Sequence, residues 1–270
     1  MTSGLPPMLP AGCGAEISVE ALRQGLDQGE IGVHYQPIVS IARCRPVMVE
    51  ALARWHRGGA VIAPDAFIPL AERAGLDCLL SARVVGRAMA EIAPLWARLR
   101  LGVSINLPLA QLLRPDLATK LRRDIARHGL DPRRVALELT ETTPVRDSAR
   151  MHRVLLRLRG LGFRVLLDDV LPGDPRAHLF DLPFAGLKLD RSLVRLLPGS
   201  ASMRETVRRL VRRAERRGQV VIAEGVSDRR IWSALRGLGV HYAQGFAVGH
   251  PLPSAALPGW WACWRSGRQP

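Results

Sequence analysis

Two adjacent acidic residues, Asp168 and Asp169, follow directly on a strand-like segment at residues 164–167, of which three residues are large and apolar. Such a continuous apolar run is typical of a parallel strand that is covered on both faces. Two neighbouring carboxylates repel each other unless cations lie between them. Taken alone, the pair fits a metal site and a strand-end turn with a helix-capping aspartate about equally well. The decision therefore depends on the rest of the chain.

The other strand-like segments carry polar or charged side chains at or near the same end. These residues are Glu50 and Arg54, Asn106, Glu138 with Glu141 just beyond, Lys188 and Asp190, Glu224, and Gln244. For any single acid, a helix cap or a solvated loop charge is the better explanation. In a βα barrel, however, matching strand ends meet at one face, where active sites are built.

So many carboxylates in one pocket would be strongly unfavourable without divalent metal ions. The candidate ligands are all oxygen donors, and no Cys or His stands among them. Oxygen ligands of this kind favour Mg²⁺ or Mn²⁺ over zinc. The strand ends therefore predict an acidic site for two metal ions, suited to phosphoryl chemistry.

Hydrophobic periodicity predicts the elements that must position this site. Strands are expected at residues 33–39, 46–55, 101–106, 134–139, 164–167, 185–190, 219–223 and 241–246. Helices are expected at residues 18–27, 64–74, 80–99, 109–128, 148–161, 202–217 and 228–238. The short turn after the first strand allows a hairpin but not a parallel crossover. Repeated βα units allow a doubly wound sheet or a closed barrel; eight strands favour an α/β fold, a (β/α)8 TIM-type barrel with an antiparallel first strand.

We expect a flexible Pro- and Gly-rich leader at residues 1–16, a barrel domain at residues 17–256 and a Trp-rich tail at residues 257–270. Packing against the barrel is the expected use of Trp260, Trp261 and Trp264, ahead of contact with a partner or a membrane surface. No apolar run approaches the roughly 20 residues of a membrane span, and no secretion signal stands at the N-terminus. The four cysteines are scattered without paired spacing, which favours a cytoplasmic location.

The net charge of +15 raises the question of a nucleic-acid partner. Of the 39 basic residues only two are lysines, Lys120 and Lys188, and 37 are arginines. This skew is typical of genome-wide codon bias rather than of selection for one ligand, so nucleic acid is not expected. The basic helix at residues 202–217 is interpreted as a barrel-wall helix with a solvated face, ahead of a surface for DNA or an acidic partner. Lys188 marks a position that needs either a compact point charge or a group that can lose its proton.

Several short motifs occur in a fixed order along nearly the whole chain. They are YQPIV at residues 35–39, VEALARW at 49–55, FIPLAE at 67–72, SINL at 104–107, ELTET at 138–142, LDD at 167–169, LKLDRS at 187–192, AEGV at 223–226 and YAQGF at 242–246. The ordered set resembles the EAL domain family, the phosphodiesterases of the bacterial signalling nucleotide cyclic di-GMP, from about residue 18 to residue 253. The signature triplet falls at residues 50–52, and a second Glu-Ala-Leu triplet at residues 20–22 is a coincidence on a leading helix.

The resemblance implies two metal ions, Mg²⁺ or Mn²⁺, held by six side chains: Glu50, Asn106, Glu138 and Asp168 for one ion, and Asp168 (bridging), Asp169 and Glu224 for the other. The activity it implies is hydrolysis of cyclic di-GMP to linear pGpG by two-metal, in-line attack of water.

The resemblance also implies roles beyond metal binding. Lys188 would engage the attacking water and belong with Glu50 to the catalytic set, in which Glu141 would brace the loop that follows the strand of Asp168. The nucleotide would be bound by Gln36, Arg54 and Gln244, with Arg54 at a phosphate.

Two departures from the family pattern bear on activity. Where the family has Phe-Gly-Thr-Gly-Tyr-Ser-Ser after its paired aspartates, this chain has VLPGDPR at residues 170–176, and Pro172 and Pro175 restrict the backbone there. Ser227 replaces a supporting glutamate, a kind of change that typically costs ~10–100-fold in metal affinity or activity. The alternative is therefore a catalytically weak or inactive domain that acts as a cyclic di-GMP receptor or as a regulator of a protein partner. A homodimer and a regulatory partner both stay open.

Overall fold

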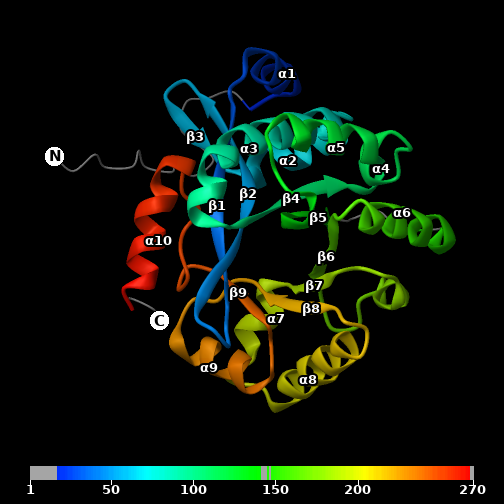
Figure 1. Cartoon of the computed structure of the whole chain (residues 1–270), viewed down its shortest axis with the longest axis vertical. Helices are drawn as coiled ribbons and strands as arrows, with labels where there is room; N and C mark the ends of the chain where they lie inside the picture. Colours follow the sequence, from blue (N-terminus) through cyan, green and yellow to red (C-terminus); the bar gives the residue numbers. More distant parts are fainter. Residues whose placement is uncertain (1–16, 141–144, 146, 268–270) are drawn as a thin grey trace.

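The computed structural model describes residues 17–140, 145 and 147–267, and they form a closed barrel of eight strands surrounded by helices (Figure 1). The barrel strands are β1 (Ile31–Ser40), β2 (Arg45–Arg57), β4 (Gly102–Pro108), β5 (Val135–Thr140), β6 (Arg164–Val170), β7 (Gly186–Leu189), β8 (Val220–Ala223) and β9 (Tyr242–Gln244). Their order is β1-β9-β8-β7-β6-β5-β4-β2, and β1 also pairs with β2, which closes the barrel. The TIM-type barrel expected from the sequence is confirmed.

Strand β1 is antiparallel to both of its neighbours, β2 and β9. The remaining barrel pairs are parallel. The turn between β1 and β2 spans only residues 41–44, too short for a parallel crossover. The antiparallel first strand is thus confirmed. The register places Gln36 opposite Glu50 and Ile38 opposite Gln244. A short strand that periodicity did not predict, β3 (Ala60–Ile62), pairs with the end of β2.

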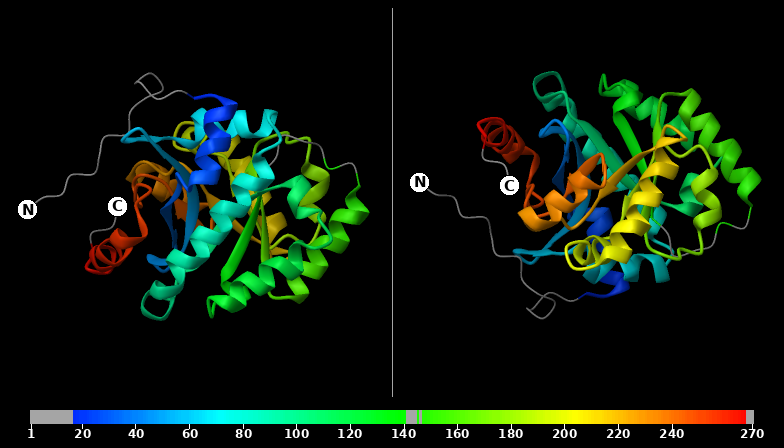
Figure 2. Two further views of the ribbon diagram at one scale, coloured as in Figure 1. Left: turned by 90° about the horizontal axis from the view of Figure 1, so that it is seen from above. Right: turned by 90° about the horizontal axis from the view of Figure 1, so that it is seen from below.

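Helices cover the outside of the strands in both perpendicular views (Figure 2). They are α1 (Val19–Gln28), α2 (Pro64–Arg73), α3 (Asp77–Leu99), α4 (Leu109–Leu112), α5 (Leu117–Arg127), α6 (Ser148–Gly160), α7 (Arg191–Leu196), α8 (Ala201–Glu215), α9 (Arg229–Gly237) and α10 (Leu257–Arg265). The described residues also form short 3-10 turns: η1 (Pro132–Arg134) before β5, η2 (Ala177–Asp181) between β6 and β7, and η3 (Ser254–Ala256) before α10. None of the helices in the described part of the chain has the length and apolar character needed to cross a membrane.

One helix expected from periodicity is in fact two. The segment 109–128 is broken between α4 and α5. Pro115 lies at the break, and a proline cannot supply the backbone N–H that a continuous helix needs there. The short helix α7 was not expected, because six residues are too few to show helical periodicity.

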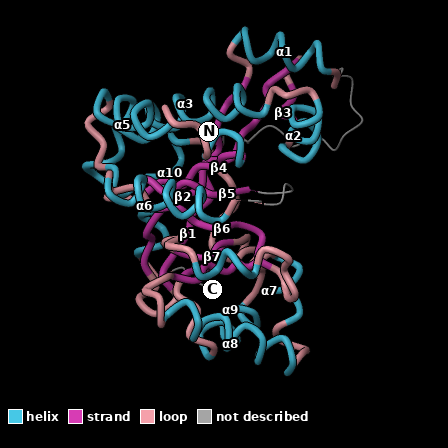
Figure 3. The backbone as a smooth tube through the Cα atoms, turned by 90° about the vertical axis from the view of Figure 1, so that its right-hand side faces the viewer, coloured by secondary structure: helices cyan, strands magenta, loops and turns pink. Residues whose placement is uncertain are grey.

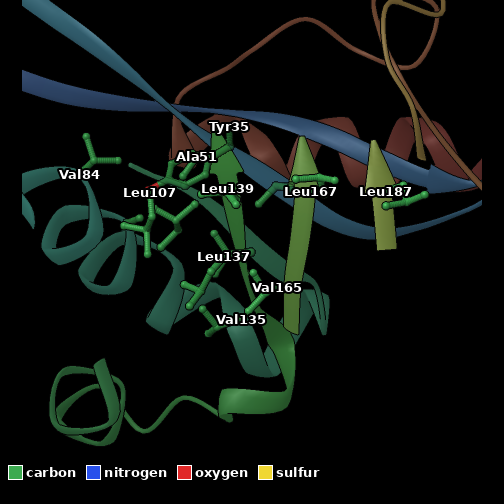
Figure 4. Close-up of a cluster of buried hydrophobic side chains, with 14 of the residues drawn as sticks. Tyr35, Ala51, Val84, Leu107, Val135, Leu137, Leu139, Val165, Leu167 and Leu187 are labelled. Atoms are coloured by element: carbon green, nitrogen blue, oxygen red, sulfur yellow. The ribbon is translucent and has the colours of Figure 1, made fainter. Parts of the chain in front are cut away.

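The alternation of side chains along each strand separates the core from the interior of the barrel. On β5, Leu137 and Leu139 point outwards into the main core under the helices (Figure 4). The opposite face of the strands lines the barrel, where a second, smaller apolar cluster contains Ala136 of β5 with Ile38, Leu166 and Ile222. Because side chains repeat every two residues in a strand, each strand presents its next inward residue towards its carboxyl end. These inward residues are Glu138 on β5, Asp168 on β6 and Glu224 just after β8.

The Trp-rich segment near the C-terminus packs on the barrel. Helix α10 lies beside the hairpin of β1 and β2 (Figure 1), and the tube view places the helices around the central strands (Figure 3). Trp264 is 3% exposed, and its indole N–H donates to the carbonyl of Cys44 at 2.9 Å. Trp260 donates to the carbonyl of Val248 at 3.1 Å. The expectation that these tryptophans pack against the barrel is confirmed, while the leader at residues 1–16 lies outside the described residues.

Helix α8 is a wall helix, as its sequence indicates. Val207, Val211 and Ala214 are buried against the barrel. Arg213 on the helix and Arg217, two residues after its end, pair with Asp181 at 2.5 and 2.7 Å. These arginines are therefore surface partners of a neighbouring turn.

Candidate metal centre

A cavity of about 600 Å³ opens at the carboxyl ends of the parallel strands. It is lined by polar side chains from most of the barrel strands, among them Gln36, Glu50, Asn106, Asp168, Asp169, Lys188, Glu224 and Gln244. Glu138 lies beneath its floor and is fully buried. The strands thus bring together at one mouth of the barrel residues that are up to 208 positions apart along the chain.

Lys188 lies at the centre of this group and is 1% exposed. Its ammonium nitrogen is 2.8 Å from a carboxylate oxygen of Glu138 and 3.1 Å from one of Asp168. Glu224 lies at 2.5 Å and Glu50 at 3.6 Å. Burial alone would lower the pKa of Lys188, but the four surrounding carboxylates hold it well above its usual range. One ammonium group therefore serves as the shared counter-charge of four acids.

The acids respond differently to this environment. Burial, followed by the negative charge of Glu50, raises the pKa of Glu138 well above its ordinary value. Burial likewise raises the pKa of Glu224. Burial also opposes ionisation of Glu50, but Lys188 and the amides that donate to it bring the pKa of Glu50 below its usual value. A single lysine does not neutralise the cluster, so further positive charge would be stabilised there.

Side-chain amides orient Glu50. Asn106 donates to one of its oxygens at 2.7 Å and Gln244 donates to the other at 2.6 Å. Gln244 also donates to the side-chain oxygen of Gln36 at 3.0 Å, and Gln36 donates to the carbonyl of Gly249 at 3.1 Å. The antiparallel β1 makes this network possible, because its register sets Gln36 beside Glu50 and close to β9.

Two overlapping sets of carboxylates have oxygen atoms close enough to share a metal ion. Glu50, Glu138 and Asp168 form one set, and Asp168, Asp169 and Glu224 form the other, with the ligand atoms of each set within 4.8 Å of one another. Asp168 belongs to both. Among the buried acceptors of the site that lack a hydrogen-bond partner are one oxygen of Glu138 and the side-chain oxygen of Asn106. Unpartnered oxygens and a purely oxygen donor set fit Mg²⁺ or Mn²⁺.

The backbone at the end of β6 is irregular at Asp169, the second of the paired aspartates. Asp169 has a φ of 52°, in the left-handed region that few residues other than glycine adopt. The pairing of β6 with β7 is irregular between Leu167 and Val170. Asp168 accepts a hydrogen bond from the backbone N–H of Asp169 at 2.9 Å. Partial removal from water and the neighbouring charge of Asp168 raise the pKa of Asp169 to about 6.

The remaining residues predicted from the sequence do not all line the cavity. Arg54 is 3% exposed, does not line the cavity, and donates to the carbonyl of Ala53 at 2.7 Å. Its Nε atom is buried without a partner. Glu141 lies outside the described residues. Asp190 lines the cavity but caps α7, because its carboxylate accepts the backbone N–H of Ser192 at 2.7 Å.

Several cavity residues received no role from sequence reasoning, among them two arginines and a phenylalanine. Arg191 and Arg195 line it from α7, and Phe246, which is 64% exposed, lines it after β9. Arg191 follows a strand-end acid and Phe246 follows Gln244 by two residues, so both stand beside predicted site residues. The divergent residues 170–176 do not line the cavity.

Comparison with known proteins agrees with this geometry. The profile of the EAL domain family matches residues 19–251. The cyclic di-GMP phosphodiesterase PA2567 of Pseudomonas aeruginosa is 32% identical over 94% of this chain and 44% of its own length. The probable cyclic di-GMP phosphodiesterase PdeB of Escherichia coli is 33% identical over 88% of this chain and 46% of its own length. The chain spans about a third to a half of the length of such curated relatives.

Solved structures show the same barrel. The PaMucR phosphodiesterase in complex with c-di-GMP is 31% identical, with a TM-score of 0.80 over 88% of this chain and 98% of that one. The EAL domain protein of Listeria monocytogenes is 25% identical, with a TM-score of 0.80 over 92% of this chain and 99% of that one.

Proposed function

The chain belongs to the EAL domain family, and we propose that it hydrolyses cyclic di-GMP to linear pGpG with the help of two Mg²⁺ or Mn²⁺ ions. The observation that carries the proposal is the pair of overlapping oxygen-ligand sets that share Asp168 and surround Lys188. Named phosphodiesterases among the relatives and a relative solved with c-di-GMP support the choice of substrate.

Six side chains would hold the two ions: Glu50, Asn106, Glu138 and Asp168 the first, and Asp168, Asp169 and Glu224 the second. Bound there, the ions would activate water and stabilise both oxygens of an in-line displacement at phosphorus. The orphan oxygens of Glu138 and Asn106 are available for the first ion.

Lys188 would act on the attacking water. Its ammonium group donates to Glu138 and forms ion pairs with Asp168 and Glu224, which the cations would engage, so cation binding would release its N–H groups for a water or a phosphate oxygen. Gln36 and Gln244 would bind the nucleotide from the wall formed by β1 and β9. Arg54 would bind a phosphate after its buried side chain turns towards the cavity, and Glu141 would brace the nearby loop. A homodimer, a regulatory partner and a cytoplasmic location stay predictions of the sequence.

The two Glu-Ala-Leu triplets of this chain provide a matched test of the proposal. Purified protein with Mg²⁺ or Mn²⁺ should convert cyclic di-GMP to pGpG, measured by chromatography. Glu50→Ala should lower the rate by more than about 100-fold, the upper range for residues that only support a metal ligand. Glu20→Ala, in the exposed first turn of α1, should leave the rate unchanged.

Absence of pGpG at every metal concentration, from protein that remains folded, would contradict the catalytic proposal. The departure of residues 170–176 from the family pattern supports a second candidate, a cyclic di-GMP receptor. Tight binding in a calorimeter without turnover would support that receptor function instead.

A further inference from the structure

The segment that departs from the family pattern, residues 170–176, is organised around one buried ion pair. Asp174 is 7% exposed, and the side chain of Arg176 is 12% exposed. One oxygen of Asp174 accepts from the backbone N–H and the Nε–H of Arg176 at 2.7 and 3.0 Å, and the other accepts from Nη2 at 2.8 Å. Such a bidentate, charge-assisted pair fixes the guanidinium plane as well as its position.

The same guanidinium reaches back to the metal-centre backbone. Its Nη2 atom donates to the carbonyl oxygens of Asp168 and Asp169, each at 2.9 Å. These are the carbonyls at the point where β6 loses its regular pairing with β7. Arg176 therefore supplies hydrogen bonds where the strand ladder is interrupted.

The backbone conformation held there is an unfavourable one. Asp169 has a φ of 52°, and a non-glycine residue in the left-handed region is strained and persists only where its surroundings enforce it. Arg176 binds the carbonyl of this residue and of the residue before it. Pro172 and Pro175 restrict the connecting turn, which reduces the number of conformations that the free loop can adopt.

We propose that Arg176, held by Asp174, is a positioning residue that fixes the main chain of Asp168 and Asp169 and so sets the geometry of both metal sites. The inference rests on the proposed function, in which Asp168 bridges two ions and Asp169 holds one of them. Residues 170–176 thus contain an ion pair that supports the two aspartates from outside the cavity. Neither Asp174 nor Arg176 lines the cavity, so each acts only through the aspartates.

Binding of Mn²⁺ to the full-length protein, measured by electron paramagnetic resonance, tests this inference without any need for turnover. Arg176→Gln should weaken Mn²⁺ binding by about 10–100-fold, the range found when the partner of a metal ligand is removed. Arg176→Lys keeps the charge but not the planar fork, so its Mn²⁺ affinity should fall between those of Arg176→Gln and the parent.

Arg204→Gln is the matched control. The Nη1 atom of Arg204 also donates to two successive backbone carbonyls, those of Leu197 and Pro198, at 2.8 and 3.1 Å. Its loss should lower the melting temperature in EDTA and leave the Mn²⁺ affinity at the parental value. The contrast separates positioning of the aspartates from general support of the fold.

Each outcome bears on one of the two proposals or on both. Equal Mn²⁺ affinity of Arg176→Gln and the parent, or an equal loss in Arg204→Gln, overturns the positioning role. A parent that binds Mn²⁺ but yields no pGpG contradicts the phosphodiesterase proposal alone. A parent that binds neither Mn²⁺ nor, by calorimetry, Mg²⁺ overturns both. If Arg176→Gln does not fold, Asp174→Asn, which removes the charge that holds the guanidinium, is judged by the same criterion.

Discussion

Lys188 occupies a position that its charge alone would make unfavourable. A buried ammonium group is stable only where anions and hydrogen-bond acceptors surround it, and four carboxylates lie within 3.6 Å of its nitrogen. The dependence is mutual, because without that nitrogen Glu50, Glu138, Asp168 and Glu224 would face one another as buried like charges.

The two lysines of the chain allow a paired test of this interpretation. Lys188→Met should destabilise the protein in EDTA by about 3–5 kcal/mol, the cost of removing one partner of a buried ion pair. Lys120→Met, which removes an exposed partner of Asp116, should have a far smaller effect. Urea unfolding in EDTA and in Mn²⁺ would measure both, and Mn²⁺ should restore part of the loss only in Lys188→Met. Equal losses in the two variants would show that Lys188 does not stabilise the acids.

At the scale of elements, strand positions could be predicted because the barrel strands are marked by apolar runs and by polar residues at one end. Glu138, Asp168 and Glu224 share one face with the interior cluster for the simple reason that they stand two residues beyond its members. Periodicity could therefore place their strands and their end of the barrel. It could not show that a single lysine would bridge four acids, since that depends on distances between strands.

The parts that sequence could not predict are set by local backbone detail or by tertiary contact. Pro115 lies between α4 and α5, in a segment whose apolar spacing predicts one continuous helix. Arg54 is buried and does not line the cavity, which depends on tertiary contacts that the sequence does not reveal. The prolines at residues 172 and 175 indicated an altered loop. The hydrogen bonds from Arg176 to the carbonyls of Asp168 and Asp169 cannot be predicted from the sequence.

Helix α10 is an element whose contribution can be tested separately. Trp264→Ala removes a buried indole that packs against Trp260 and donates to the Cys44 carbonyl in the turn between β1 and β2. It should destabilise the protein by about 3–5 kcal/mol, as large-to-small changes of buried aromatics do. Trp261→Ala, at a partly exposed position of the same helix, should cost clearly less. Urea denaturation would measure the loss of unfolding free energy in both variants. Equal losses would contradict the proposal that Trp264 anchors α10 to the barrel.

At the scale of the whole molecule, charge is distributed unevenly. The chain carries a net charge of +15, yet at this mouth of the barrel four carboxylates lie within 3.6 Å of one ammonium group, and a fifth, that of Asp169, lies beside Asp168. The surface arginines favour the approach of an anion through long-range attraction, which salt weakens. Near the bottom of the cavity the short-range interaction with a phosphate is repulsive until cations bind. Metal and nucleotide should therefore bind with positive coupling.

This coupling can be measured with a phosphorothioate analogue of cyclic di-GMP that resists hydrolysis. Calorimetry in Mg²⁺ should show tighter binding than in EDTA by roughly 5–150-fold, the usual range for coupled sites. Because linkage is reciprocal, the analogue should strengthen Mg²⁺ binding by the same factor. NaCl at matched ionic strength screens charges but does not bind to the carboxylate sets. Adding it in EDTA should therefore leave the affinity for the analogue unchanged or lower it. An affinity that is equal in Mg²⁺ and EDTA, or that NaCl raises as much as Mg²⁺ does, would place the nucleotide away from the carboxylates and contradict a shared site.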